Sequence, residues 1–264
     1  MNTNLVAPIP CEVLQVKPEN EHEVTFRVAS QIRPEHGQFL QLSLPKVGEA
    51  PISVSAFGEG WLEFTIRAVG RVTDKLFALR PGENLFLRGA YGKGWPMEQI
   101  AGKHLVVISG GTGLAPVRSL LQQAANDSTL FPSLHLIAGF RNSASILFKE
   151  ELEAWRKPFS CFYTLDDEEM SGFAKGFVTA HLDKIPLTQL GEDYNVLIVG
   201  PPAMMHFTAL GCLKLGIPEE RIWLSFERKM SCAIGKCGHC RIDEVYVCLD
   251  GPVFNYRIAK DMVD

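Results

Sequence analysis

The feature that most constrains the fold is a change of hydrophobic pattern near residue 100. Before it, short segments alternate apolar with polar residues, as in HEVTFRVA at 22–29 and WLEFTIR at 61–67. This two-residue period is typical of half-buried β-strands. After it, unbroken apolar runs such as HLVVI at 104–108 alternate with segments of helical period. That second pattern is typical of strands covered on both faces by helices. Two different architectures are therefore predicted in succession.

The segments before residue 100 predict a small closed sheet. Turn signals that contain glycine or proline separate the candidate strands, as in RPGE at 80–83. The alternation predicts that each strand turns one face to a core and the other to water. The candidate strands are CEVLQVK, HEVTFRVA, QFLQLSL, PISVSAF, WLEFTIR and NLFLR. Their number and spacing favour an antiparallel β-barrel.

The predicted fold class is thus a β-barrel followed by a parallel-sheet α/β domain and a short C-terminal segment. We place the domain boundaries at 1–98, 99–226 and 227–264. The last segment is rich in cysteine and glycine and too short to build a core of its own. Some other interaction must therefore hold it in place.

Composition and charge exclude several classes of protein. The chain has 264 residues, a net charge of -4 and 46% hydrophobic residues, which is ordinary for a soluble globular protein and unlike a nucleic-acid binder. The sequence has no apolar run long enough for a membrane span. The N-terminus lacks the basic start and apolar stretch of a signal peptide. We therefore expect a cytoplasmic protein.

The C-terminal segment carries the most specific motif, four cysteines spaced C-x4-C-x2-C-x7-C. They are Cys232, Cys237, Cys240 and Cys248. The x4-then-x2 order is the one that plant-type [2Fe-2S] ferredoxins use. Zinc sites more often pair two C-x2-C knuckles, and disulfides are disfavoured in a reducing compartment. A [2Fe-2S] cluster on these four thiolates is the favoured prediction, with zinc as the alternative.

The other three cysteines and the histidine inside the motif are given no ligand role. Cys11, Cys161 and Cys212 stand singly in apolar surroundings, as small buried hydrophobes do. His239 lies between two of the ligand cysteines, but four cysteines already complete a ligand set.

Two glycine-bearing turns predict a nucleotide site in the second half of the chain. SGGTGLAP at 109–116 follows a buried strand and opens a helix, whose N-terminus attracts a pyrophosphate. A tight turn between strand and helix also needs glycine, so the motif alone is weak. It does not match G-x-G-x-x-G, which argues against an ordinary Rossmann dehydrogenase. VGPPAMM at 199–205 offers a second turn at the same sheet edge.

A third stretch of interest lies in the barrel, in APISVS at 50–55 and TIRAVGRVT at 65–73. Ser53 can donate a hydrogen bond, and Arg67 and Arg71 can offset the charge of a phosphate. Thr73 can start a short helix. The alternative is that these are ordinary barrel strands with a polar edge.

Taken together, these stretches resemble the ferredoxin-NADP reductase family, in which a flavin-binding barrel precedes a pyridine-nucleotide domain. The cysteine motif narrows the resemblance to electron-transfer subunits with a C-terminal [2Fe-2S] cluster. That branch includes subunits of dihydroorotate dehydrogenase, NAD(P)-linked hydrogenases and anaerobic sulfite reductase. The chain is most similar to the hydrogenase gamma and sulfite reductase B subunits in GEAPISVS, RGAYGKGWP, GGTGLAPVRSLL, GPPAMM and SFERKMSCAIGKCGHC.

The resemblance implies a flavin site in the barrel. Of the family motif Arg-x-Tyr/Phe-Ser the chain keeps Ser53, while Ala50 replaces the arginine that contacts phosphate. The resemblance still implies FAD as the flavin, and the missing arginine leaves FMN as the alternative. The implied flavin-binding residues are Pro51, Ile52, Ser53, Ile66, Arg67, Val69, Val72 and Thr73.

The resemblance also implies a nucleotide site and the groups nearest the reacting atoms. The implied nucleotide-binding residues are Gly110, Gly111, Thr112, Gly113, Leu114, Ala115, Pro116, Gly200, Pro201, Pro202 and Met204. Ser53 and Glu227 are candidates for residues beside the flavin, which is itself the catalyst. Val199 stands where some relatives have a cysteine, so no thiol is expected to act there.

The implied activity is that of an NAD(P)H-dependent flavin and iron-sulfur oxidoreductase subunit. Electrons would pass from NADH or NADPH to FAD, then to the [2Fe-2S] cluster, then to catalytic and iron-sulfur subunits of a reductase complex. Anaerobic sulfite reductase is the favoured complex, and a cytoplasmic hydrogenase or sulfhydrogenase is the alternative. A stand-alone flavin reductase and a zinc-stapled nucleotide-binding module remain open. NADH is favoured over NADPH, although Arg141 could contact a 2′-phosphate.

Overall fold

The computed structural model describes residues 6–262 and divides the chain into two compact units. One unit comprises the chain up to Trp95, together with Ala115–Ser119 and Glu227–Val253. The other comprises Pro96–Leu114, Leu120–Phe226 and the chain from Phe254 onward. The units are called the barrel unit and the sheet unit below.

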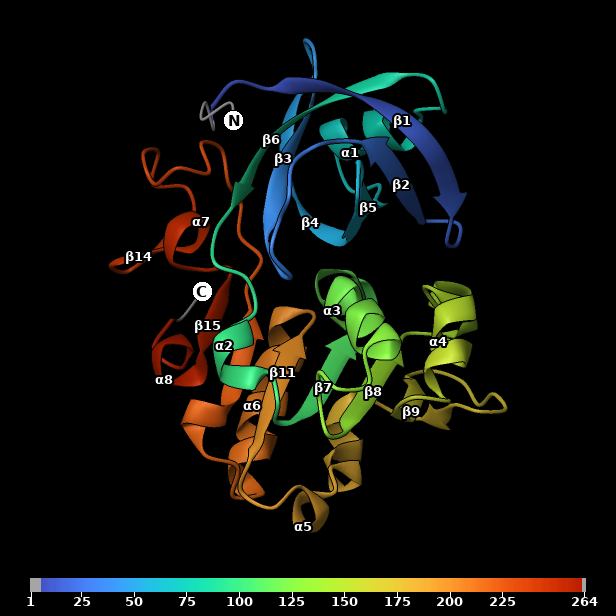
Figure 1. The fold of residues 1–264 in the computed structure, drawn as a ribbon, viewed down its shortest axis with the longest axis vertical. Coiled ribbons are helices and arrows are strands. Elements are labelled where there is room, and N and C mark those ends of the chain that lie inside the picture. The colour runs from blue at the N-terminus through green and yellow to red at the C-terminus, as the bar shows by residue number, and fades with distance from the viewer. Residues whose placement is uncertain (1–5, 263–264) are drawn as a thin grey trace. The chain divides into compact units, whose positions relative to one another are not determined.

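The barrel unit is built on a closed antiparallel barrel, which confirms the predicted fold of the first part (Figure 1). Its strand order is β1-β2-β5-β4-β3-β6. The strands are β1 Ile9–Pro18, β2 Glu23–Ala29, β3 Phe39–Leu44, β4 Gly48–Gly58, β5 Trp61–Arg67 and β6 Asn84–Tyr91. A short helix, α1, spans Arg71–Phe77 between β5 and β6. All six strands coincide with the segments of alternating hydrophobicity.

The inner face of the barrel follows the period-two pattern. Phe26, Leu62 and Phe64 come from neighbouring strands β2 and β5, and each is 0% exposed. They belong to a continuous apolar core that also includes Leu40 and Leu85. Closure of the sheet therefore turns alternate side chains of neighbouring strands into one common core.

The outer face differs from the prediction that it would meet water. Glu23 and Glu63 are 1% and 6% exposed. Arg67 pairs with Glu23, while Arg27 and Arg118 both donate to Glu63 at 2.9 and 2.5 Å. The prediction was wrong for these positions because arginines from other segments cover and neutralise the carboxylates, which makes burial of the charge tolerable.

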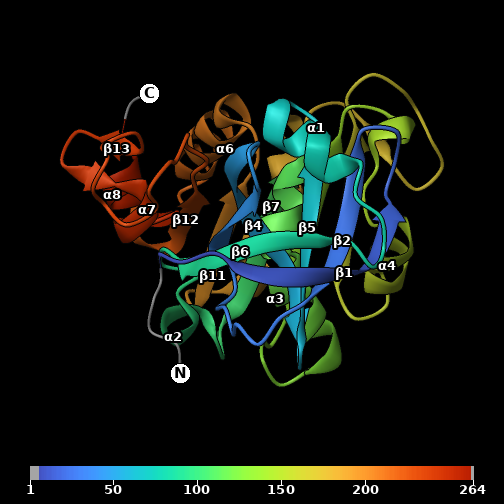
Figure 2. The ribbon, with the colours of Figure 1, turned by 90° about the horizontal axis from the view of Figure 1, so that it is seen from above.

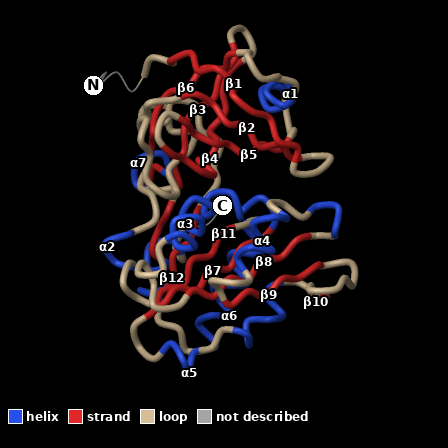
Figure 3. Tube along the Cα trace, turned by 45° about the vertical axis from the view of Figure 1, so that its right-hand side comes forward, coloured by secondary structure: helices blue, strands red, loops and turns tan. Residues whose placement is uncertain are grey.

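The sheet unit contains a seven-stranded sheet of order β10-β9-β8-β7-β11-β12-β15. Every recorded pair from β10 to β12 is parallel, as the unbroken apolar runs predict. In Figure 3 the strands β7, β8, β9 and β11 lie between α3 and α4 on one side and α6 on the other. The strands are β7 His104–Gly110, β8 Leu134–Phe140, β9 Ser160–Leu165, β10 Ala174–Lys175, β11 Tyr194–Val199, β12 Ile222–Ser225 and β15 Val253–Asn255.

Helices of moderate and short length connect these strands. The α-helices are α2 Met97–Ile100, α3 Ala115–Asn126, α4 Lys149–Trp155, α5 Leu187–Leu190, α6 Pro202–Lys214 and α8 Tyr256–Ala259. The 3₁₀ helices are η1 Gly111–Leu114, η2 Ser143–Ser145, η3 Val178–Lys184 and η4 Glu219–Arg221. Among residues 6–262, none of the helices combines the length and apolar character needed to cross a bilayer.

The cysteine-rich segment belongs to the barrel unit and is held there by hydrogen bonds. It contains a small hairpin of β13 Arg241–Ile242 and β14 Val245–Tyr246, followed by α7 Val247–Asp250. Arg88 of β6 donates to the carbonyls of Ser231 and Cys232 at 2.8 and 2.7 Å, so the segment lies beside β6 (red beside β6 in Figure 2). The amide of Lys93 also donates to the carbonyl of Gly251 at 2.5 Å.

The barrel core gives the first prediction. Phe64→Ala removes a fully buried ring and should lower the free energy of unfolding by about 3 to 5 kcal/mol, measured by denaturant titration. Leu14→Ala is the control, because Leu14 in β1 is 46% exposed and its truncation should change stability by no more than about 0.5 kcal/mol. Equal losses in the two variants would contradict the assignment of the core to the barrel interior.

Candidate functional site

The two glycine-bearing turns meet at the carboxyl edge of the parallel sheet. β7 and β11 are adjacent strands, and Ser109 pairs with Val199 at their ends. A Cβ added to Gly113 would lie 2.5 Å from the carbonyl oxygen of Val199. One added to Gly200 would lie 2.8 Å from Sδ of Met204 and 3.1 Å from the amide nitrogen of Gly110. The backbones therefore approach so closely that side chains at these glycines would not fit.

Within the first turn, only part of the predicted set is open to a ligand. The turn is itself a 3₁₀ helix, Gly111–Leu114, so helical N–H groups begin before α3 starts at Ala115. A Cβ at Gly111 would meet nothing within 4 Å, which marks an open side of the turn. Leu114, Ala115 and Pro116 are buried, so they could serve a nucleotide only through their backbone. In the second turn, Pro201 and Pro202 are exposed and Met204 is half-buried.

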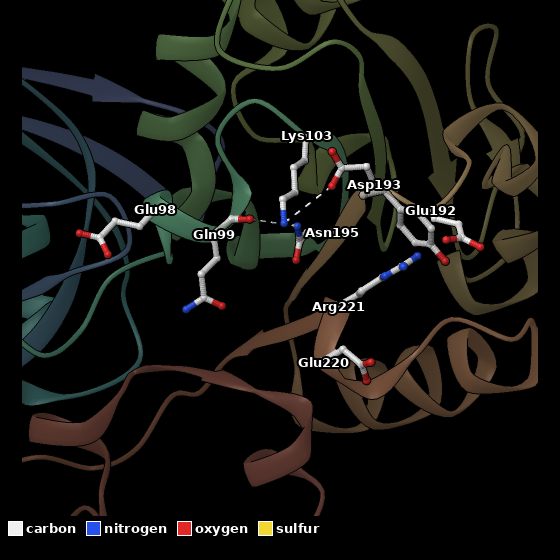
Figure 4. A pocket seen from close by; sticks show the side chains of 9 residues that line it. Glu98, Gln99, Lys103, Glu192, Asp193, Asn195, Glu220 and Arg221 are labelled. Carbon is white, nitrogen blue, oxygen red and sulfur yellow. Dashed lines mark hydrogen bonds and ion pairs between the residues drawn. The ribbon is translucent and has the colours of Figure 1, made fainter.

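A pocket of about 400 Å³ lies at the opposite edge of the same sheet, where β7 and β11 begin (Figure 4). Lys103 lies 3.7 Å from Asp193 across it, and the guanidinium of Arg221 stacks 4.8 Å from the ring centroid of Tyr194. The cations in this pocket are thus already engaged, and we assign it no ligand. Its lining is Glu98, Gln99, Lys103, Glu192, Asp193, Tyr194, Asn195, Glu220 and Arg221.

The candidate flavin residues lie on β4, the end of β5 and the start of α1. Ser53 is half-buried on β4, across from Phe39 of β3. Val69 is 75% exposed in the loop after β5, so its side chain is accessible to a ligand. Ile66 differs, because its side chain belongs to the barrel core and is 1% exposed. It could contact a flavin only through its backbone, and Ile52 and Val72 also pack against the core.

Thr73 shapes the loop that carries Val69. Its hydroxyl accepts a hydrogen bond from the amide of Val69 and donates one to the carbonyl of Gly70, each at 3.0 Å. α1 begins at Arg71 with Gly70 as its N-cap, so Thr73 lies in the first turn of the helix and does not cap it. The hydroxyl therefore closes the loop together with the amide of Val69 and the carbonyl of Gly70.

The charged groups near this edge are partly neutralised by each other. Arg67 pairs with the buried Glu23, and with Ala50 in place of arginine the exposed Arg71 is the remaining cation of the predicted set. Glu227 follows β12 and keeps access to solvent. Desolvation by the surrounding protein raises the pKa of its carboxyl, and Arg67 partly counteracts this.

The cysteine loop turns its backbone N–H groups toward sulfur. The amides of Ile234, Lys236 and Cys237 donate to Sγ of Cys232 at 3.5, 3.3 and 3.3 Å. The amide of Gly235 donates to Sγ of Cys248 at 3.3 Å. This arrangement requires left-handed backbone at Ala233, Gly235 and Gly238, with φ values of 60°, 71° and 77°. Converging N–H groups are suited to an anionic, sulfur-ligated group.

The thiols of the motif interact with one another. Cys237 hydrogen-bonds with Cys232, and backbone hydrogen bonds, first from His239, lower the pKa of the Cys237 thiol to about 7. Cys248 hydrogen-bonds with Cys240, and burial first, then its neighbouring thiols, raise the pKa of Cys248 to about 12. Over residues 6–262, no group of three or more His, Cys, Asp or Glu side chains is arranged around a single metal position. Pairs of thiolates fit a two-iron centre, in which each iron takes two cysteines.

Sequence reasoning missed the residues that fasten this loop to the barrel. Arg88 is 6% exposed and makes hydrogen bonds with Glu49, Tyr91 and the carbonyls of Ser231 and Cys232. Burial by itself lowers the pKa of Arg88, but the hydrogen bonds that Arg88 donates to Glu49 and Tyr91 outweigh it and the net shift is upward. The available signal was an arginine on the outward-facing side of the apolar strand NLFLR, next to the RGAYGKGWP motif.

Comparison with known proteins identifies two regions of the chain. Residues 107–209 match the model of an oxidoreductase NAD-binding domain. Residues 227–258 match the model of the iron-sulfur cluster binding domain of dihydroorotate dehydrogenase B. The gamma subunit of sulfhydrogenase 1 from Pyrococcus furiosus is 34% identical over 83% of this chain and 78% of its own length. The chain belongs to the ferredoxin-NADP reductase family.

Within that family the chain is similar to electron-transfer subunits. A probable dihydroorotate dehydrogenase B electron transfer subunit from Methanopyrus kandleri is 32% identical over 94% of this chain and 90% of its own length. The structure of an NADH-dependent reduced ferredoxin-NADP oxidoreductase matches with a TM-score of 0.78 and 24% identity, covering 96% of this chain and 89% of the other. The ferredoxin NADP+ reductase of Neisseria gonorrhoeae matches with a TM-score of 0.70 and 21% identity, over 82% and 97%. These two structures support the fold.

The thiol environments give the second prediction. In the metal-free, reduced chain, Cys237 should react first with iodoacetamide at pH 7, because its exposed thiol has a pKa near 7 and the thiolate is the nucleophile. Its rate should rise with pH and level off above about pH 8, since the thiolate fraction saturates above the pKa. Buried Cys11 and Cys212, whose pKa values burial raises to about 11 and about 12, serve as internal controls. Peptide mass spectrometry after timed quenching would show the order, and faster labelling of Cys212 would contradict it.

Proposed function

We propose that this chain is the NAD(P)H-oxidising electron-transfer subunit of a multi-subunit reductase. The observation that carries the proposal is the cysteine loop, in which four backbone N–H groups point at two of four thiols on a chain that also has an NAD-binding domain. Bound FAD and a [2Fe-2S] cluster would supply hydride acceptance from the nicotinamide and one-electron transfer onward. We therefore assign no side chain a role as general acid or base.

The residues of the chain would bind and orient these groups. We propose that the backbone from Gly110 to Thr112 and the turn from Gly200 to Met204 hold the nicotinamide nucleotide at the shared edge of β7 and β11. We propose that Ser53, Val69 and the loop closed by Thr73 hold the flavin, with Arg71 beside its phosphates. In this scheme residues 1–98 bind flavin, 99–226 bind the nucleotide and 227–264 bind the cluster.

The proposal of [2Fe-2S] rather than zinc rests on the C-x4-C-x2-C spacing and on the backbone N–H groups that point at sulfur. Cys232 with Cys237, and Cys240 with Cys248, would each serve one iron. Thiols must lose their protons when they bind a metal, and the raised pKa of the Cys248 thiol opposes this loss in the metal-free chain. Free thiols of this kind persist in a reducing compartment, which supports a cytoplasmic location.

The partner is proposed from similarity rather than from geometry. The relatives with 34% identity are gamma subunits of sulfhydrogenases 1 and 2. This similarity supports a hydrogenase-type partner, which is the second candidate. Anaerobic sulfite reductase remains the candidate from the sequence motifs SFERKMSCAIGKCGHC and RGAYGKGWP. In both cases the chain would be one subunit of a hetero-oligomer, receiving electrons from NADH or NADPH.

The third prediction tests the cofactors. The anaerobically purified chain should contain flavin together with about two iron and two sulfide per chain. NADH should bleach the flavin absorption. Cys237→Ser should lose the iron because it removes one of the four thiolates, while Cys161→Ser should retain it because Cys161 lies outside the loop on β9. Metal analysis and visible spectra measure all of these quantities. One zinc per chain without flavin would overturn the proposal in favour of a nucleotide-binding module.

The fourth prediction concerns the partner. The tagged chain, purified under anaerobic conditions from its own cells, should bring down a catalytic subunit whose cofactor identifies the complex. Siroheme in the complex would establish the sulfite reductase candidate, and nickel would establish the hydrogenase candidate. NADH-dependent reduction of sulfite or of protons by the complex, and not by the chain alone, is the expected activity. Full terminal activity of the isolated chain would contradict the subunit assignment.

A further inference from the structure

We propose that Arg88 and Glu49 form a charged clamp that positions the cysteine loop on the barrel and sets the reduction potential of the cluster bound there. Both residues act through the loop, so both are positioning residues. The inference rests on the proposed function, because it takes Cys232 as a ligand of a redox-active group. It adds that two barrel residues outside the ligand set control how easily that group is reduced.

The geometry of Arg88 leaves none of its donors free. A guanidinium has five N–H groups. Nε donates to Oε2 of Glu49 at 2.8 Å, and Nη2 donates to Oε1 of Glu49 and to the carbonyl of Ser231, the latter at 2.8 Å. Nη1 donates to the hydroxyl of Tyr91 at 2.9 Å and to the carbonyl of Cys232 at 2.7 Å. One side chain thus joins strands β4 and β6 to the start of the cysteine loop.

Arg88 lies in a layer from which water is largely excluded, whereas the side chain of Glu49 is 31% exposed. Arg88 pairs in register with Gln41 of β3, and the two are 6% and 0% exposed. Their neighbours in sequence, Leu87, Leu40 and Leu42, belong to the barrel core, so the alternation places Arg88 and Gln41 on the outer face. That face is where the loop is hydrogen-bonded. The charge of Arg88 is therefore weakly screened and acts strongly on a nearby redox group, while solvent screens the charge of Glu49 in part.

The clamp ends at the first ligand of the motif. Arg88 binds the carbonyl of Cys232, while Sγ of the same residue accepts three backbone N–H groups from the loop. Hydrogen bonding to the ligand sulfurs and the net charge around a cluster are two of the factors that set its reduction potential. Fixing the carbonyl of Cys232 therefore fixes the part of the loop on which the N–H···S geometry depends.

The two charges of the clamp should act in opposite directions. Reduction adds one negative charge to the cluster, which the positive guanidinium stabilises and the carboxylate destabilises. Removing the charge of Arg88 leaves Glu49 uncompensated and should lower the potential. Removing the charge of Glu49 leaves Arg88 uncompensated and should raise it. A purely structural loosening of the loop has no reason to shift the potential in opposite directions for the two changes.

The experiment is a redox titration of the full-length chain with its cluster, followed by electron paramagnetic resonance and normalised to iron content. Arg88→Gln should make reduction about tenfold less favourable and Glu49→Gln about tenfold more favourable, which is about 59 mV each way for a one-electron couple. Arg88→Lys keeps the charge but cannot make five hydrogen bonds, so it should shift the potential less than Arg88→Gln. Arg27→Gln is the matched control, because Arg27 pairs with Glu63 on the same barrel and should leave the potential unchanged.

Three outcomes would overturn the clamp. They are shifts of the same sign in the Arg88→Gln and Glu49→Gln chains, shifts smaller than about threefold in both, or an equal shift in the Arg27→Gln control. If Arg88→Gln does not retain its cluster, Glu49→Gln and Arg88→Lys still decide the question, because Glu49→Gln preserves the shape and a hydrogen-bond acceptor. Failure of the proposed function is distinct, since the unsubstituted chain would then contain no redox-active iron to titrate.

Discussion

A short segment with no core of its own must take its shape from hydrogen bonds to something larger, and that constraint governs the C-terminal part of this chain. The barrel supplies the anchor through Arg88 and through the backbone of Lys93. Backbone N–H groups of the segment in turn donate hydrogen bonds to two cysteine sulfurs. The barrel therefore positions the loop, and the loop positions the cysteine sulfurs. The geometry of the four cysteines depends on a barrel strand that lies more than 140 residues earlier in the sequence.

The nucleotide edge depends on a different constraint, the close approach of two backbones. Gly113 and Val199 are separated by most of the sheet unit in sequence, but adjacent parallel strands bring them within contact. Where backbones approach so closely, glycine is required at the turn. The two candidate sites therefore differ in construction. The glycine turns leave no room for side chains, whereas the cysteine loop is arranged around the sulfur atoms of its side chains.

The fold was predictable to the extent that hydrophobic period and turn residues determine it. All six barrel strands and the parallel strands β7, β8, β9, β11 and β12 follow from local patterns, because neighbouring residues determine the pattern of burial, whereas the two-residue β10 has no such pattern. Burial on the outer face of the barrel was not predictable in this way, since Glu63 is covered by Arg118, 55 positions away. Ile66 shows the same limit at the candidate site, because its membership of the core depends on the register of the closed barrel. The role of Arg88 required knowledge of which segment covers its strand.

Under the proposed nucleotide site, the ion pair between Arg141 and Asp167 would be the place where cofactor preference changes. Arg141 lies 3.3 Å from Asp167, and the two side chains are 80% and 60% exposed. The glycines of the turn are fixed by the backbones around them, whereas this pair is free of packing constraints. Substitutions at this pair that change the preferred nicotinamide cofactor would therefore cost little free energy of unfolding. Such a change is open to single surface substitutions, and descendants of one ancestral chain could differ in their electron donor while sharing the same barrel, sheet and cysteine loop.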